Sequence, residues 1–401
     1  MQVGRKIGKY QSMTRQQEIS IYKNNILIGT LARTSKGAVF KYAKAIEASE
    51  NLCFKMPVSQ IEYVIEGHNL HPFFANLLPE GLRLKLLLER NKISKDDLFN
   101  IFRLAGTDFI GDIHTEFKTQ DDSKIILKNK TIVNFYDYFL ETLSVPEALT
   151  GIQEKISASM ISLPLRGTNR KKSYIIKLNP KDKPHLIEDE FICLLYAKKC
   201  GLISSKAKII EDRDHNKALM VERFDRISSD SKIIRVHQED ACQLLDIYPF
   251  DKYNTSINDI TKELRKVLTA PQVGILNLMQ MISFSYLIGN GDLHGKNISV
   301  TVSPETKVVS LTPAYDLIPT IIYGDTQMAL PLDGKKDNLK RKTFIEFGKR
   351  FGLRTEAIEN MLNNLLLKAT RNFDLFNQAP WSKKEQNLFK NLFSSRLKDL
   401  R

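Results

Sequence analysis

The chain has 401 residues, of which 42% are hydrophobic and 26% charged, so it can bury a large core and divide into two or three domains. No run approaches the roughly 18 to 20 apolar residues that a membrane span needs, and the start, Met1 to Lys6, lacks the apolar core of a secretory signal. With four cysteines that show no metal-ligand spacing, these features predict a soluble, cytoplasmic protein without a membrane partner.

The formal net charge is +14, and it is concentrated toward the carboxyl end. From Lys335 onward the chain has 16 Lys and Arg against seven Asp and Glu. Such a concentration permits contact with nucleic acid or an acidic partner, although a lysine-rich helical surface is more often simply solvated.

The amino-terminal part is predicted to be a small α+β module that spans residues 1–118. Residues 18–31 are rich in β-branched side chains and are interrupted by Asn24-Asn25, which indicates a hairpin because Asn tolerates the left-handed backbone of a tight turn. Residues 38–42 form a plausible third strand. From Leu82 to Leu88 the apolar spacing becomes helical, after a helix entry at residues 79–81.

The middle of the chain, residues 119–226, is predicted to be a strand-rich unit with one helix. The helix covers residues 188–200 and ends at Gly201, a common C-terminal stop. A predominantly helical part follows at residues 227–401, with a helix near residues 273–288 and basic helices at the carboxyl end. This order is typical of a two-lobed kinase, so the predicted fold class is α+β. The strands are expected at residues 124–128, 156–165, 173–178 and 218–224.

The run Ile288 to Asn297, followed by Tyr315-Asp316, carries the strongest chemical signal. Asp292 and Asn297 are five residues apart, as in a kinase catalytic loop, where the carboxylate accepts the substrate hydroxyl proton and the amide oxygen holds magnesium. Asp316, 24 residues after Asp292, is a candidate second ligand that bridges Mg²⁺ to the phosphates. Taken alone, Asp292 fits a turn or helix cap equally well.

The middle unit offers groups for the rest of a nucleotide site. Lys177 is a lone lysine at the end of an apolar strand, and the following helix begins with Glu188-Asp189-Glu190. A carboxylate from that helix would orient the lysine toward ATP phosphates, with Glu190 the first choice and Glu188 the substitute.

The segment Val221 to Arg226 fits a hinge between the lobes. It follows an apolar strand, and an adenine base is usually bound by backbone groups of such a segment. We expect the Glu222 carbonyl and the Phe224 N–H to face the base, with Asp225 near the ribose hydroxyls. The alternative is an exposed edge strand with alternating charges.

Taken together, these motifs resemble those of the HipA family, serine/threonine kinase toxins of bacterial toxin–antitoxin pairs. The resemblance spans nearly the whole chain and implies a bilobed protein-kinase-like fold with an added N-terminal β-rich subdomain that binds ATP and Mg²⁺. It rests on residues 77–81, 151–155, 175–178, 221–226, 237–240, the Asp292 loop and Tyr315-Asp316, together with the amino-terminal hairpin.

Carried over by residue, the resemblance implies that Asp292 is the catalytic base, that Asn297 and Asp316 ligate magnesium, and that Lys177 binds the phosphates. It also makes a phosphate loop of residues 151–155, although a single glycine matches neither the Walker pattern nor the multi-glycine kinase loop. The further candidates for nucleotide contact are Gly151, Gln153, Lys155 and His294. Lys296 is a candidate for the γ-phosphate, although a lysine or histidine in such a loop more often holds it together.

The resemblance also implies partners: a helix-turn-helix antitoxin, operator DNA contacted only through the antitoxin complex, and a protein substrate of the translation machinery, such as an aminoacyl-tRNA synthetase. Members often carry a regulatory serine before the phosphate loop, where this chain has Ala148. Substitutes for it are Thr150, Ser144 or Ser157, and mass spectrometry after incubation with ATP would detect phosphate there.

Two alternatives remain open from the sequence. The Gly-Asp-Leu-His run also resembles the loop of aminoglycoside-type phosphotransferases, whose acidic drug pocket fits poorly with so basic a lobe. Phosphorylation of kanamycin-like compounds but of no protein would favour that function. The other alternative is an inactive kinase-like corepressor that binds DNA with a helix-turn-helix partner, against which the intact ionic positions argue.

Overall fold

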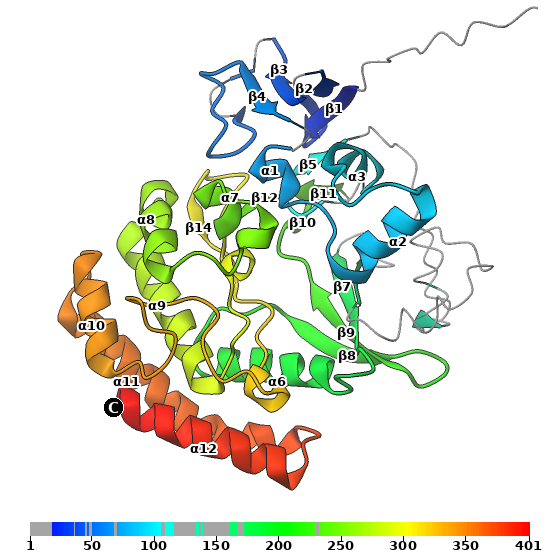
Figure 1. The fold of residues 1–401 in the computed structure, drawn as a ribbon. Helices are drawn as coiled ribbons and strands as arrows, with labels where there is room; N and C mark the ends of the chain where they lie inside the picture. Colours follow the sequence, from blue (N-terminus) through cyan, green and yellow to red (C-terminus); the bar gives the residue numbers. More distant parts are fainter. Residues whose placement is uncertain are drawn as a thin grey trace, which may run out of the picture.

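A computed structural model of the chain describes residues 18–35, 37–44, 46–47, 50–67, 70–105, 109–115, 134–135, 138, 161–166, 172–229 and 232–401. Residues 18–115 form an N-terminal module above a larger body, and residues 341–400 form an outer layer of helices below it (Figure 1). No helix in the described ranges is long and apolar enough to cross a bilayer. The four cysteines are buried and reduced, as expected.

The N-terminal module is built on an antiparallel sheet with the strand order β4-β3-β2-β1-β5. The expected hairpin is confirmed, because Asn24 and Asn25 connect its first two strands with φ of 46° and 72°. The expected third strand is also present. The strands are β1 (Glu18–Lys23), β2 (Ile26–Thr34), β3 (Gly37–Tyr42), β4 (Glu62–Glu66) and β5 (Ile113–His114).

Two helices, α1 (Pro72–Ala75) and α3 (Leu98–Ala105), cover this sheet, and α2 (Gly81–Asn91) packs against α3. Aromatic side chains fill the space between the layers, with the ring of Phe74 in contact with those of Phe40 and Phe102. Rings of this size bury a large apolar area, so they contribute much of the stability of a small module. Helix α2 begins as predicted, after Glu80 at its N-cap.

A second antiparallel sheet has the order β6-β7-β9-β8 and packs against helix α6 (Leu186–Lys199). Strand β7 has the predicted bounds, and the predicted helix starts two residues earlier than expected. The Asn179 Oδ1 accepts a hydrogen bond from the Ile187 N–H (2.8 Å) and so satisfies one of the helix's free amides. The strands are β6 (Ile161–Arg166), β7 (Ser173–Leu178), β8 (Ala207–Glu211) and β9 (Lys217–Glu222). The strand expected at residues 124–128 lies outside the described residues.

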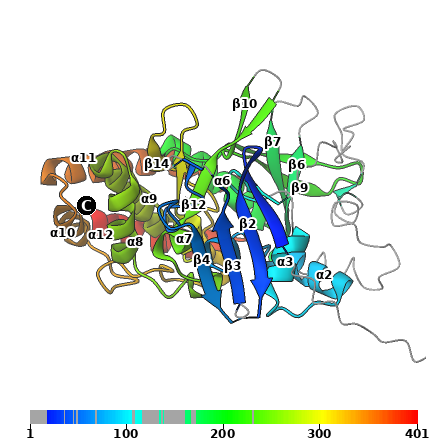
Figure 2. The same cartoon turned by 90° about the horizontal axis from the view of Figure 1, so that it is seen from above.

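The body is helical around α9 (Pro271–Ile288), whose apolar residues lie on all sides, as in a helix that other helices surround. Viewed from above, helices α10 to α12 and strands β6, β7 and β9 lie on opposite sides of the molecule (Figure 2). The other helices are α7 (Ala241–Leu245), α8 (Ile257–Val267), α10 (Arg341–Arg350), α11 (Thr355–Asn372) and α12 (Lys383–Leu400), with short 3₁₀ turns η3 (Pro249–Asp251), η4 (Gly295–Asn297), η5 (Thr320–Tyr323) and η6 (Phe373–Gln378).

The prediction of a predominantly helical remainder missed five short strands. A hairpin of β10 (Arg226–Ser229) and β11 (Lys232–Arg235) follows the hinge segment. A three-stranded sheet of β12 (His237–Asp240), β13 (Ser299–Val302) and β14 (Val309–Leu311) carries the catalytic loop. Strands of three or four residues are too short for alternation of apolar and polar residues to reveal them.

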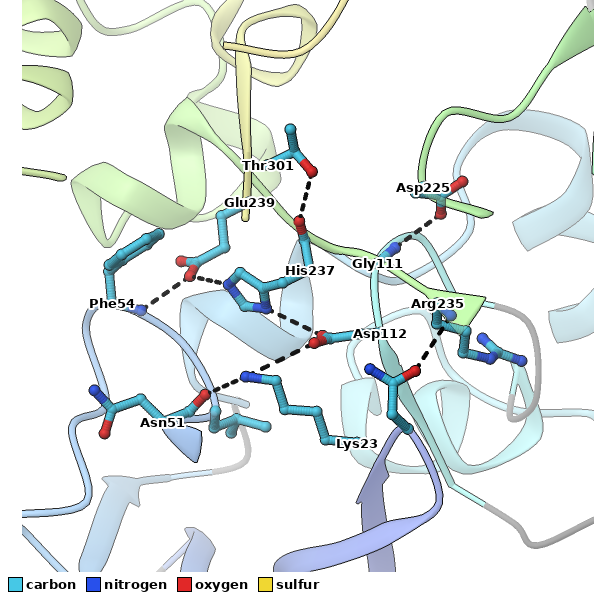
Figure 3. Close-up of polar contacts among 12 residues, drawn as sticks. Lys23, Asn51, Phe54, Gly111, Asp112, Asp225, Arg235, His237, Glu239 and Thr301 are labelled. Atoms are coloured by element: carbon cyan, nitrogen blue, oxygen red, sulfur yellow. Dashed lines mark hydrogen bonds and ion pairs between the residues drawn. The ribbon is translucent and has the colours of Figure 1, made fainter. Parts of the chain in front are cut away.

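A buried charged cluster joins the N-terminal module to β12. The His237 ring lies between two carboxylates, with Nδ1 3.0 Å from Asp112 Oδ1 and Nε2 2.8 Å from Glu239 Oε1 (Figure 3). Glu239 also accepts a hydrogen bond from the Phe54 N–H (2.9 Å), and Lys23 lies 3.7 Å from Asp112. Residues 237–240 therefore join the module to the body.

The positive charge on His237 strengthens the attachment of the N-terminal module to the body. Burial alone would lower the pKa of His237, but the Asp112 and Glu239 carboxylates outweigh burial and raise it to about 9. The imidazolium form is thus stabilised in the folded protein. Its contribution to stability is fully present below the ordinary histidine pKa and is lost as the pH rises through about 9.

We expect the free energy of unfolding to fall by roughly 3 kcal/mol between pH 6 and pH 10 through this histidine. His237→Gln should abolish that part of the pH dependence, because an amide can hydrogen-bond but not titrate. Urea unfolding at several pH values measures it, with His215→Gln as the control, since His215 is exposed. Identical pH profiles for the wild type and His237→Gln would contradict this role.

Candidate active site

The loop after α9 is shaped by close backbone contacts. Gly289 ends the helix with φ of 70°, which favours glycine. A Cβ on Gly291 would lie 2.6 Å from the Gln327 carbonyl oxygen, so a larger residue would displace the neighbouring chain. The Asp292 N–H then donates to the Oδ1 of the buried Asn290 (2.9 Å). These contacts fix the backbone of Asp292.

The Asp292 carboxylate remains accessible, with 40% of its side chain exposed. Tyr253 donates its hydroxyl proton to Asp292 Oδ1 (2.6 Å), and the Tyr253 ring lies edge-on to the His294 ring, with 5.0 Å between centroids. The Asn297 Nδ2 donates to the Asp292 carbonyl oxygen (2.8 Å). This bond orients the Asn297 amide, and its oxygen accepts no hydrogen bond from the described residues.

Lys177 is the centre of the site. It lies on β7 with only 7% of its side chain exposed, and its Nζ donates to both oxygens of Glu190 (2.7 and 2.8 Å) and to Asp316 Oδ1. The pair predicted from the sequence is therefore present. Burial alone would lower the pKa of Lys177, but Asp316 and Glu190 outweigh burial and raise it. Lys177 is thus a permanent cation.

Asp316 brings the second carboxylate to Lys177 from the chain that follows β14. Its φ of 52° lies in the left-handed region, which costs energy for a residue with a Cβ. The preceding Tyr315 donates to the Lys296 carbonyl oxygen (2.7 Å) and hydrogen-bonds the Ser299 hydroxyl (2.6 Å), so the segment is tied to the catalytic loop. About a third of the Asp316 side chain, 35%, is exposed.

The substitute partner, Glu188, lies elsewhere. It accepts a hydrogen bond from Asn179 Nδ2 (3.0 Å) and pairs with Lys217 at 3.8 Å. Successive residues of a helix point about 100° apart, so Glu188 and Glu190 leave α6 in opposite directions. The structure thus selects Glu190 as the partner of Lys177.

The hinge segment has the geometry of a strand end. The Glu222 N–H donates to the Lys206 carbonyl oxygen (2.8 Å), and the Glu222 carboxylate pairs with Lys172 (2.9 Å). The Phe224 ring lies 5.7 Å from the ring of Tyr315. No described residue accepts a hydrogen bond from the Phe224 N–H, which suits a group that is to bind a base.

Asp225 has a different environment from the one expected near a ribose. Its carboxylate is buried, receives hydrogen bonds from Arg223 and Arg226 (2.7 Å each to Oδ2), and accepts a further bond from the Gly111 N–H (3.0 Å). Burial alone would raise the pKa of Asp225, but the two guanidinium groups outweigh burial and lower it. These contacts fasten the hinge to the end of the N-terminal module.

Lys296 likewise turns toward the N-terminal module. Its Nζ donates to the Asn76 carbonyl oxygen (2.7 Å) and pairs with Glu80 (3.1 Å) and Asp240 (3.8 Å). These contacts favour the structural alternative for Lys296 over a γ-phosphate contact. His294 is buried beside Asp292, where burial lowers its pKa, and its Nδ1 has no partner among the described residues.

Several candidates lie outside the described residues: Gly151, Gln153 and Lys155 of the expected phosphate loop, Ala148 at the position of the regulatory serine, and its substitutes Ser144, Thr150 and Ser157. Within the described ranges, no three His, Cys, Asp or Glu side chains form a preformed metal cluster. Asn297 and Asp316 nevertheless fit Mg²⁺, which takes oxygen ligands and is usually held by one or two carboxylates together with substrate phosphates.

Tyr253 is a member of the site that the sequence analysis missed. It precedes Asp292 by 39 residues and belongs to no motif. Its position follows from η3 and the turn after it, which a hydrogen bond from the Gly295 N–H to the Lys252 carbonyl oxygen (3.0 Å) holds against the catalytic loop. No local sequence pattern encodes such a contact.

Comparison with known proteins gives consistent matches along the chain. The family model described as the HipA N-terminal domain matches residues 19–116, and that of the HipA-like C-terminal domain matches residues 148–373. The protein Y4dM of Sinorhizobium fredii is 28% identical, with 76% of this chain and 78% of the relative covered. The serine/threonine-protein kinase toxin HipA of Shewanella oneidensis is 25% identical, with 81% of both chains covered.

Among solved structures, the fold matches a chain of the Shewanella oneidensis complex of HipA, HipB and operator DNA. The TM-score is 0.70 at 21% identity, and the match covers 95% of this chain and 96% of that one. The predicted fold class, a bilobed protein-kinase-like α+β fold with an N-terminal β-rich subdomain, is confirmed.

The buried contacts of Asp225 predict that Asp225→Ala lowers the free energy of unfolding by about 3–5 kcal/mol, because two guanidinium groups lose a buried partner. Glu222→Ala is the control. Its carboxylate is partly exposed and pairs with an exposed lysine, so its loss should cost less than about 1 kcal/mol. Urea unfolding compares the two variants, and equal losses would contradict a structural role for Asp225.

Proposed function

Since the chain belongs to the HipA family, we propose that it is an ATP- and Mg²⁺-dependent serine/threonine protein kinase and the toxin of a toxin–antitoxin pair. One observation carries the proposal: the Lys177 ammonium is held between Glu190 and Asp316. A kinase needs this combination, a lysine for the phosphates that a helix carboxylate orients and an aspartate for the metal.

The roles of the residues follow from their environments. Lys177 binds the phosphates, Asn297 and Asp316 hold Mg²⁺, and backbone groups of Glu222 and Phe224 bind the adenine. Magnesium, when bound, neutralises charge on the phosphate oxygens. Asp292 accepts the proton of the substrate hydroxyl, and the hydrogen bond from Tyr253 to Oδ1 orients its carboxylate.

Catalysis by such a site is mainly positioning and electrostatics, because phosphoryl transfer asks for little covalent chemistry from the protein. The buried ion pair supplies a cation at a fixed position, and the exposed Asp292 supplies a base that a protein hydroxyl can reach. The buried Glu190 carboxylate does not need to move with the substrate. Because the base is exposed while the phosphate-binding cation is buried, a substrate as large as a protein can reach the base without disturbing the ion pair.

The partners are proposed from the relatives. The matched Shewanella complex contains HipB and operator DNA, and we infer that this chain binds a helix-turn-helix antitoxin and reaches DNA only through that complex. The excess of Lys and Arg after residue 335 supports such proximity to DNA. The proposed substrate is a protein of the translation machinery, such as an aminoacyl-tRNA synthetase, in the cytoplasm.

Asp292→Asn should lower phosphate transfer from labelled ATP into proteins of a bacterial lysate by about 100-fold or more, because the variant lacks the base. Asp325→Asn, which makes the same change in charge close to the catalytic loop, should keep wild-type activity. Gel autoradiography measures the transfer. Equal labelling by both variants would contradict the role of Asp292, and labelling of kanamycin-like compounds without labelling of protein would contradict the protein substrate.

Asp316→Asn should raise the Mg²⁺ concentration required for half-maximal ATP turnover, since a neutral amide is a weaker ligand for a hard cation than a carboxylate. Glu188→Gln serves as the control, because Glu188 lies on the same helix as Glu190 but pairs with Asn179 and Lys217. A Mg²⁺ titration of ATP turnover measures the effect. If Asp316→Asn required the same Mg²⁺ concentration as the wild type, Asp316 would not be a magnesium ligand.

A further inference from the structure

Asp189 is a fully buried carboxylate that none of the proposed roles uses. It lies on α6 between Glu188 and Glu190, with 0% of its surface exposed. No lysine or arginine pairs with it among the residues that the structure describes. A buried carboxylate without a cation is costly unless hydrogen bonds satisfy it, so its partners carry information about its role.

Two hydrogen bonds satisfy Asp189, and they come from two separate segments. Tyr323 donates its hydroxyl proton to Oδ2 (2.6 Å), and the indole Nε1 of Trp381 donates to Oδ1 (2.6 Å). Tyr323 ends η5, seven residues after Asp316. Trp381 lies just before α12 and packs on the rings of Phe376 and Phe389. One carboxylate therefore joins α6, the segment after Asp316 and the C-terminal helices.

This arrangement acts on the proposed phosphate site through the first turn of α6. Asp189 and Glu190 are consecutive, so they leave the same turn about 100° apart. Glu190 holds Lys177, whereas Asp189 holds Tyr323 and Trp381. Any rotation or shift of this turn that broke the Asp189 contacts would also move Glu190 away from Lys177.

The ionisation of Asp189 fits this role. Burial raises the pKa of Asp189 to about 6, and the hydrogen bonds from Tyr323 and Trp381 oppose the rise. At neutral pH the carboxylate is therefore ionised, and both hydrogen bonds are charge-assisted and strong. His185 lowers the pKa of Asp189 and Glu188 raises it, and Asp189 also interacts electrostatically with Cys193.

We propose that Asp189 is a positioning residue that fixes the Lys177–Glu190 pair by fastening α6 and the segment after Asp316 to the C-terminal helices through Tyr323 and Trp381. The inference rests on the proposed ATP site. It adds that the outer helical layer, far from Asp292 in the sequence, determines how firmly the phosphate lysine is held.

The chain offers a matched pair of tyrosines for the test. Tyr323→Phe removes the hydroxyl that bonds Asp189. Tyr196→Phe removes a buried hydroxyl of the same helix that donates to the Ala369 carbonyl oxygen (2.7 Å), at the other end of α6. Both variants lose one hydrogen bond between α6 and a neighbouring segment, part-buried for Tyr323 and buried for Tyr196, so both should lower the thermal unfolding midpoint.

Only the variants that lose a hydrogen bond to Asp189 should change the affinity for ATP. With a fluorescent ATP analogue, Tyr323→Phe and Trp381→Phe should weaken affinity about tenfold, the effect expected for one lost hydrogen bond to a charged group. Tyr196→Phe should bind the analogue like the wild type. Equal affinity of Tyr323→Phe and Tyr196→Phe would overturn the inference, because Asp189 would then contribute to stability alone.

A rescue at Asp189 itself completes the test. Asp189→Asn can keep both bonds, since its amide oxygen accepts from Trp381 and its amide N–H donates to the Tyr323 oxygen, so it should retain most of the affinity. Asp189→Leu should lose it, and wild-type affinity of that variant would also overturn the inference. If the wild type bound no ATP analogue, that result would contradict the proposed function itself, and the inference, which rests on it, would be contradicted as well.

Discussion

The architecture depends on one buried ammonium group shared by two carboxylates. Lys177 comes from the second sheet, Glu190 from α6 and Asp316 from the chain after β14, so their contact fixes three elements that are distant in the sequence. A buried lysine is costly unless it is paired. The fold satisfies it with two carboxylates, and burial together with the nearby Asp316 raises the pKa of Glu190 to about 7. A divalent cation beside Asp316 would relieve the repulsion between these two carboxylates.

The same principle recurs where the N-terminal module meets the body. His237 lies between Asp112 and Glu239, Asp225 lies between Arg223 and Arg226, and each set includes groups from the module or bonds to its backbone. Lys296 adds a contact from the catalytic loop to Asn76. The module is therefore attached by buried charges at the hinge and at the catalytic loop, the two places where a change in its position would reach the proposed site.

Local sequence signals allowed much of the fold and part of the candidate site to be predicted. The hairpin with Asn24 and Asn25, strand β7 and helices α6 and α9 have strong turn residues or long apolar runs. The Lys177–Glu190 pair followed from a strand end and the next helix. The short strands β10 to β14 gave no periodic signal. The environments of Asp225 and Lys296 depend on contacts with residues more than 100 positions away. Tyr253, Asp189 and Trp381 were missed for the same reason: their roles exist only once the chain has folded.

The most direct test of the account is a crystal structure with Mg²⁺ and a non-hydrolysable ATP analogue. The account predicts that Lys177 keeps Glu190 and binds phosphate oxygens, while Asp316 exchanges its contact with Lys177 for the metal and Asn297 becomes the second protein ligand. A nucleotide bound away from Lys177, or a Lys177–Asp316 pair that persists with the metal elsewhere, would contradict it.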